Sequence, residues 1–99
     1  MYPVLRLLDS VLRYRILLVL RDKECTVGQL VELLFTRFGV KYPQSTISMA
    51  LKELHAYHFV SRHPHTNDNR RRVYRIRKDV IRHALENVMH EVCVKEFSV

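Results

Sequence analysis

Arginine and lysine are concentrated in one short stretch of the chain. Between Arg62 and Arg82, eight basic residues stand against only Asp68 and Asp79, so this window of 21 residues carries +6 of the formal net charge of +7. A charge run is usually a solvated surface. Here, however, three consecutive arginines follow a turn-forming stretch, and polar His, Thr and Asn residues are mixed with them. This pattern is expected where a protein neutralises the phosphates of a nucleic acid.

Six histidines and two cysteines raise the question of a metal site or a nucleophile. Four of the histidines form two close pairs, His55 with His58 and His63 with His65. Zinc needs three or four converging ligands, with thiolates or carboxylates completing the set, and no spacing here completes one. Neither Cys25 nor Cys93 has a recognisable base or oxyanion hole. The sequence therefore predicts no metal, no cofactor and no enzyme.

Length and composition exclude further classes of protein. The 99 residues suffice for one domain. Gly28 and Gly39 are the only glycines, so no glycine-rich phosphate loop can be formed. The longest apolar run, Ile16 to Leu20, is far shorter than the ~20 residues of a membrane span. The first residues also lack the basic-then-apolar order of a signal peptide. We expect a basic intracellular protein with no membrane partner.

Caps and apolar spacing predict two helices before the basic stretch. Apolar residues at helical spacing begin at Val11, and Ser10 stands where an N-cap belongs. Thr26 followed by Gln29 matches the capping box, in which a hydroxyl and an amide satisfy orphan donors at a helix start. Gly39 stands where a left-handed terminator belongs. We expect helices over about 11–21 and 27–38.

A third helix is expected from about Gln44 to Tyr57, with one apolar and one polar face. The apolar stripe consists of Ile47, Ala50, Leu51 and Leu54. A helix of this kind, supported from behind by the preceding helix, fits the ~12 Å width of the major groove of B-DNA. Its expected base-reading residues are Gln44, Ser45, Thr46, Ser48, Met49 and Lys52. Gln grips adenine with two hydrogen bonds, Ser and Thr accept several bases, and Lys reaches phosphate or guanine.

A hairpin and a last helix complete the pattern. Residues 59–63 are predicted as a strand broken by Pro64, residues 65–69 as a turn, and residues 72–77 as the returning strand. Such a wing lies along the DNA backbone or enters the adjacent minor groove, where arginine is favoured. Its expected DNA contacts are Arg62, His65, Asn67, Asn69, Arg70, Arg71, Arg72 and Arg75. The last helix is expected from Asp79 to about Val94.

The order of these elements predicts an α+β fold, mostly α: a winged helix–turn–helix with a two-stranded β-hairpin wing and a C-terminal dimerisation helix. We expect one DNA-binding domain over residues 1–99. Within it, residues 27–57 form the helix–turn–helix, residues 59–77 the wing, and residues 1–21 and 79–97 the dimerisation helices.

Several stretches resemble the ArsR/MarR-like winged-helix transcriptional regulators. They are Leu8–Leu17 with Thr26–Leu30, Gln44–Ser48 with Leu51–Leu54, Phe59–Val60, and Val73–Ile76. The resemblance implies a transcriptional regulator that binds specific sequences of double-stranded DNA. Metal-sensing members carry paired cysteines at positions matching Thr26 and Gly28, so that thiolate site is absent here.

The small size and the two cysteines of this basic chain are also similar to winged-helix proteins of archaeal viruses, which implies the cytoplasm of a host cell. The expected function is thus a regulator acting as a homodimer on double-stranded DNA. A rival interpretation is a winged-helix module for protein contacts within a transcription assembly, with the basic wing incidental. A third interpretation is a ligand or metal sensor of the ArsR type, but the missing thiolates argue against it.

The last helix carries the signals for a dimer. Ile81, Leu85, Val88 and Val92 follow spacings of four, three and four, which suit a partner helix. Cys93 lies in the same helix, and intracellular disulfides persist in hyperthermophiles. Few Asn and Gln beside abundant Arg favour such an origin. We expect an intersubunit disulfide through Cys93, the alternative being two reduced thiols with no special role.

Overall fold

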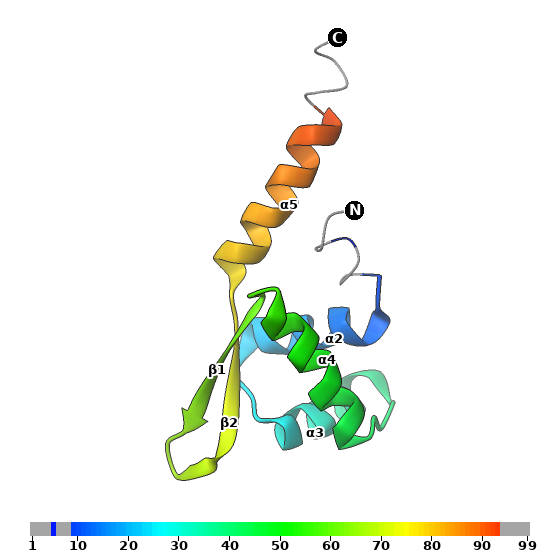
Figure 1. Cartoon of the computed structure of the whole chain (residues 1–99). Coiled ribbons are helices and arrows are strands. Elements are labelled where there is room, and N and C mark those ends of the chain that lie inside the picture. Colours follow the sequence, from blue (N-terminus) through cyan, green and yellow to red (C-terminus); the bar gives the residue numbers. More distant parts are fainter. Residues whose placement is uncertain (1–4, 6–8, 94–99) are drawn as a thin grey trace.

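The computed structural model describes residue 5 and residues 9–93. They form four helices and a two-stranded antiparallel sheet, in the order α2 (Val11–Asp22), α3 (Val27–Phe38), α4 (Gln44–Ala56), β1 (Val60–His65), β2 (Asp68–Ile76) and α5 (Lys78–Cys93) (Figure 1). The mostly helical α+β class predicted from the sequence is confirmed. The parts of the predicted dimerisation segments at 1–4, 6–8 and 94–97 lie outside the described residues.

The core lies where α2, α3, α4 and the base of the hairpin meet. The apolar stripe predicted for α4 is confirmed, since all four of its residues are buried. The largest fully buried side chains are Ile16, Leu30, Leu34, Ile47, Leu51, Leu54, Val60 and Cys25. Each buried Leu or Ile contributes about 1.5–3 kcal/mol relative to an exposed one. This packing holds α4 so that its other face is turned to solvent.

The predicted helix caps are present. The Ser10 hydroxyl accepts a hydrogen bond from the Arg13 amide at 3.3 Å and begins α2. At the start of α3, Thr26 Oγ1 accepts from the Gln29 amide at 3.2 Å, while Gln29 Oε1 accepts from the Thr26 amide at 2.9 Å. Gly39 ends α3 in the left-handed region with φ 72°, where a side chain would be strained.

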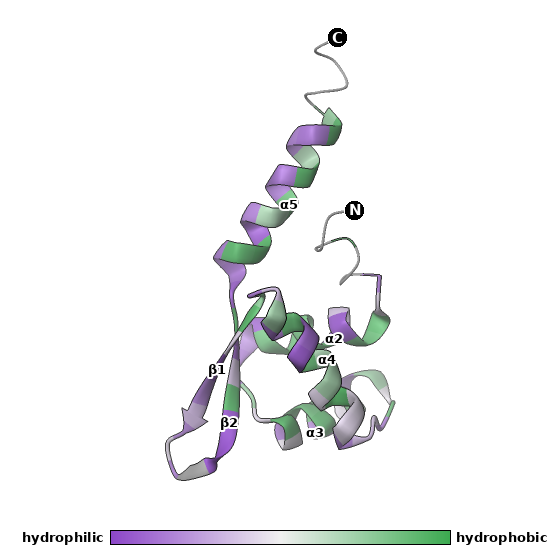
Figure 2. Ribbon diagram, viewed as in Figure 1, coloured by the Kyte–Doolittle hydropathy of each residue, from purple (hydrophilic) through white to green (hydrophobic). Residues whose placement is uncertain are grey.

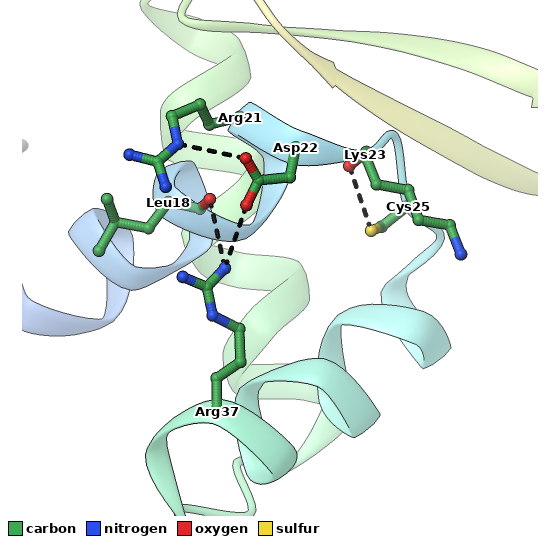
Figure 3. Close-up of polar contacts among 6 residues, drawn as sticks. All are labelled: Leu18, Arg21, Asp22, Lys23, Cys25 and Arg37. Atoms are coloured by element: carbon green, nitrogen blue, oxygen red, sulfur yellow. Dashed lines mark hydrogen bonds and ion pairs between the residues drawn. The ribbon is translucent and has the colours of Figure 1, made fainter.

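Polar contacts tie the C-terminal end of α2 to α3 (Figure 3). The Asp22 carboxylate lies between two guanidinium groups, with Arg21 at 3.3 Å and Arg37 at 3.6 Å. Arg37 also donates to the carbonyl of Leu18 at 3.5 Å. These groups are exposed, so the pairs add little stability. They link the last turns of α2 and α3.

The strands differ from their predicted bounds. The sequence predicts a strand ending before Pro64 and a turn over 65–69, but β1 continues through Pro64 to His65, and β2 already begins at Asp68. Proline is tolerated here because β1 is an edge strand within the described sheet, where a missing donor interrupts no further ladder. The register shifts between Pro64 and His65. The two strands are therefore longer than predicted, and the turn between them is shorter.

Helix α5 projects away from the other helices (Figure 1). Polar and apolar residues alternate along it (Figure 2). Within the predicted seam, Val88 is buried and Ile81 half-buried, whereas Leu85 and Val92 are exposed. Residues 9–93 thus leave an apolar surface on α5 uncovered. No helix of the described residues is long and apolar enough to cross a membrane.

Candidate nucleic-acid interface

The exposed face of α4 carries all six residues expected to read bases. Gln44, Ser45, Thr46, Ser48, Met49 and Lys52 are each exposed. Ser45, Met49 and Lys52 are four and three positions apart, so they form one row along the helix. Met49 is 64% exposed in the middle of that row. Small polar groups and one apolar side chain therefore form a ridge that reaches into solvent.

A cleft of about 680 Å³ lies between the first turn of α4, the start of α3 and the wing. Among the side chains that the structure describes, the cations at its walls are Lys23, Arg70, Arg71 and Arg72, and the one carboxylate is Glu32. Gln44 lines the cleft from the first turn of α4. The structure thus brings the three consecutive arginines beside the N-terminal end of the expected reading helix. An excess of positive charge around a groove favours an anionic ligand.

The start of α3 adds backbone donors to the cleft. The capping box engages the amides of Thr26 and Gln29. The amides of Val27 and Gly28, in the first turn, have no acceptor within the helix. Gly28 is exposed and carries no side chain that would cover them. A helix N-terminus also bears about half a positive charge, so this wall suits a phosphate oxygen.

Other expected contact residues lie away from this cleft. Arg75 forms an ion pair with Glu24, and both border a smaller groove of about 190 Å³ with His65. His65 Nδ1 accepts a hydrogen bond from the Asn67 amide at 3.1 Å and so shapes the hairpin turn. Arg62 is exposed on β1. The side chain of Asn69 lies outside the described part of the structure.

Several residues of the cleft are not expected from the sequence. Lys23, Thr26, Gln29, Glu32 and Tyr74 line it together with the arginines. Thr26 and Gln29 predict the start of a helix from the sequence. That this start also lines a cleft for an anion could be suspected only from the basic hairpin that follows later in the chain. The pairing of Glu24 with Arg75 is not predicted either, because the two are 51 residues apart.

The two cysteines lie in different surroundings. Cys25 is buried, and its thiol donates to the carbonyl of Lys23 at 3.4 Å (Figure 3). Burial raises the pKa of Cys25; nearby Lys23 lowers it and Glu24 raises it, both less strongly. The thiol therefore stays protonated at neutral pH. Cys93 is exposed in α5, and both thiols are free within this chain. Among the described residues, no three His, Cys, Asp or Glu side chains gather to hold a metal.

No model of a known protein family matches the chain, and no curated protein matches it in sequence. Any function must therefore be inferred from the physical chemistry of the ridge on α4, the cleft beside it and the basic hairpin.

Proposed function

We propose that the chain is a winged helix–turn–helix protein that binds specific sequences of double-stranded DNA and regulates transcription as a homodimer. The observation that carries this proposal is the shared border of two features. Gln44, at the first position of α4 and on its exposed face, lines one cleft together with the three arginines of β2 and the start of α3. Base-reading groups and phosphate-binding groups are thus available to the same ligand.

Helix α4 suits the major groove. Its 13 residues give a length of about 20 Å at 1.5 Å per residue. Its apolar stripe is fully used by the core, so the ridge of Ser45, Met49 and Lys52 can enter the groove without loss of packing. In helix–turn–helix proteins, residues near the N-terminus of such a helix reach the base edges.

The cleft suits the DNA strand that borders the groove. With α4 in the major groove, a phosphate in the cleft accepts hydrogen bonds from the Val27 and Gly28 amides and pairs with Arg70 and Arg72. Charge-assisted bonds of this kind are about twice as strong as neutral ones. They position the protein on the duplex and carry no sequence information of their own. The hairpin then lies over the next minor groove. Arg71 is exposed on the hairpin, so its side chain can enter that groove.

The homodimer is supported by an apolar groove of about 590 Å³ between α2 and α5. Leu17, Leu18, Ile81, Leu85 and Met89 line it. Met89 and Val92 are 57% and 55% exposed, which is costly for apolar side chains in water. A second copy of α5 covers these surfaces in a two-fold arrangement. Two α4 helices then lie about 34–36 Å apart, one turn of B-DNA.

We further propose, from the motifs of the sequence, that the protein is an ArsR/MarR-like regulator and acts in the cytoplasm, of a host cell if it is viral. Regulation of this kind requires no catalysis and no metal.

The proposal is tested by titrating fluorescent duplex DNA with the full chain at several salt concentrations. If the dimer neutralises ~6–10 phosphates, affinity falls by about 10³- to 10⁵-fold between 50 and 200 mM salt. A flat salt response, or no binding at low salt, contradicts DNA binding. Either result favours the rival function, a module for protein contacts within a transcription assembly.

A further inference from the structure

Met49 is the largest apolar group on the exposed face of α4. It is 64% exposed, between the small Ser45 and the charged Lys52 in the same row. The core does not need it, because the opposite stripe of α4 already fills the core. On the major-groove edges of the base pairs, the one apolar group is the C5-methyl of thymine. Burial against that methyl removes apolar surface of both partners from water.

The other side chains of this face favour adenine over guanine. Guanine is most often read by the paired donors of an arginine, and α4 contains no arginine although arginine is abundant elsewhere in the chain. Gln44 at the first position of α4 matches the donor and acceptor of adenine instead. Ser45, Thr46 and Ser48 discriminate little between bases. Lys52, two turns from the start of α4, is the one side chain of this face that suits guanine.

The arginines are placed in the wing, which points to the same composition independently. Arg70, Arg71 and Arg72 follow the tight turn of the hairpin and are exposed. Runs of A·T pairs have a narrow minor groove with enhanced negative potential, and this potential attracts inserted arginines. A G·C pair adds the guanine amino group to the minor groove. A wing of this charge therefore binds best beside A·T-rich steps.

We propose that the DNA sites of this protein are rich in A·T pairs, with Met49 contacting thymine methyl groups in the major groove and Arg71 of the wing entering a narrow A·T minor groove. The inference deepens the proposed DNA-binding function and rests on it. It assigns a class of target sequence and a specificity-determining residue.

The first experiment selects duplexes from a random pool with the full chain. A·T-rich sites are expected. The best duplex is then made with uracil in place of thymine, which removes only the C5-methyl. Affinity falls by about four-fold for each methyl contacted, the equivalent of one buried methylene. Met49→Ala binds the thymine duplex more weakly and no longer distinguishes thymine from uracil, whereas Met49→Leu retains the distinction. Because Met49 is exposed, none of these variants disturbs the fold.

A second arm separates the two grooves. Inosine·cytosine pairs resemble G·C in the major groove and A·T in the minor groove, since inosine lacks the guanine amino group. Placed under α4, they weaken binding by about 5- to 150-fold, the range of one bidentate contact; placed under the wing, they leave it unchanged.

Selection of G·C-rich sites, or an equal thymine preference in Met49→Ala, overturns the inference while salt-sensitive DNA binding remains. Absence of binding to every duplex at low salt overturns the proposed function as well.

Discussion

The backbones of Cys25 and Tyr74 exchange two hydrogen bonds, with N–O distances of 3.1 and 2.8 Å. The connection between α2 and α3 thereby lies beside β2, joined to it by an isolated antiparallel β-bridge. Cys25 is completely buried at this point, and Tyr74 packs against the core. Because Thr26 follows directly and caps α3, the start of α3 and the arginines of the wing are held at a fixed separation.

Burial of Cys25 predicts a loss of stability in alkaline solution. Because the pKa of its thiol is raised in the folded chain, the unfolded chain releases the proton first, above about pH 8.5. Below that pH both states are protonated and the thiol contributes no pH dependence. Above it the free energy of unfolding falls, by at most about 1.4 kcal/mol per pH unit, until the folded thiol also ionises.

Urea unfolding between pH 7.5 and 10.5 measures this effect. Cys25→Ser, whose hydroxyl does not titrate there, is expected to lack the cysteine-dependent part of the decline. Cys93→Ser is the control and keeps it, because Cys93 is exposed. An identical pH profile for Cys25→Ser and the unmodified chain would show that the buried thiol is not responsible.

Removal of the capping box is expected to destabilise the chain. Thr26→Ala leaves the Gln29 amide without its side-chain acceptor and lowers the free energy of unfolding by about 0.5–2 kcal/mol. Thr26→Ser restores most of the loss. The matched control is Thr36→Ala in the same helix, where the hydroxyl is exposed and bonds only the Glu32 carbonyl. Equal destabilisation by Thr26→Ala and Thr36→Ala contradicts the role of the cap.

Wing and ridge are expected to respond differently to mutation. Replacing Arg70, Arg71 and Arg72 by Gln weakens binding to both the preferred and the random duplex, most strongly where the wing meets A·T pairs, and lowers the salt slope by about 0.9 for each phosphate that is no longer neutralised. Gln44→Ala or Ser48→Ala costs about 1–3 kcal/mol on the preferred site and little on random DNA. Fluorescence anisotropy with both duplexes distinguishes the two effects.

The control for the charge is Arg77→Gln, an exposed residue between β2 and α5 that lines neither the cleft nor the groove between α2 and α5. It removes one positive charge and leaves the salt slope unchanged. If the α4 variants weaken specific and random DNA equally, a different helix reads the bases.

The apolar surface on α5 predicts a dimer that a single charge disrupts. Met89→Glu places a carboxylate in the groove between α2 and α5, so the dimer dissociates, while the exposed position leaves the fold of each chain intact. Light scattering at micromolar concentration measures the mass. His90→Glu adds a carboxylate at an exposed neighbouring position that does not line the groove, and it keeps the dimer. A monomeric unmodified chain rejects the interface.

An intersubunit disulfide through Cys93 predicts a band of twice the chain mass in non-reducing electrophoresis. Reductant removes the band, Cys93→Ser lacks it, and Cys25→Ser retains it because that thiol is buried. A band of single-chain mass together with free alkylation of Cys93 would leave two reduced thiols, the alternative expected from the sequence.

Local signals predict the helical part of the fold well. The serine cap of α2, the capping box of α3 and Gly39 each act within four residues along the chain, so the sequence alone contains them. The apolar stripe of α4 is equally readable, because its spacing follows the helix period. The hairpin is predicted less well, since Pro64 indicates a strand break from the sequence, whereas an edge strand tolerates it.

The candidate site depends on contacts that sequence spacing does not contain. The exposed face of α4 follows from the stripe opposite it. The joining of Gln29 and Arg71 at one cleft depends instead on the backbone pairing of Cys25 with Tyr74, 49 residues away along the chain. The ion pair of Arg75 with Glu24 follows from the same pairing. Neither the backbone pairing nor the ion pair produces a repeating pattern of residues, so neither can be predicted from the sequence.

Pro64 also governs how the wings of neighbouring molecules meet. An edge strand with free amides and carbonyls is a template on which another chain can form hydrogen bonds. In β1, Pro64 offers no amide, and the register shift beside it bends the strand. A ladder between two wings is therefore interrupted near the tip of the hairpin, at the fifth of the six residues of β1, which disfavours edge-to-edge aggregation into extended sheets.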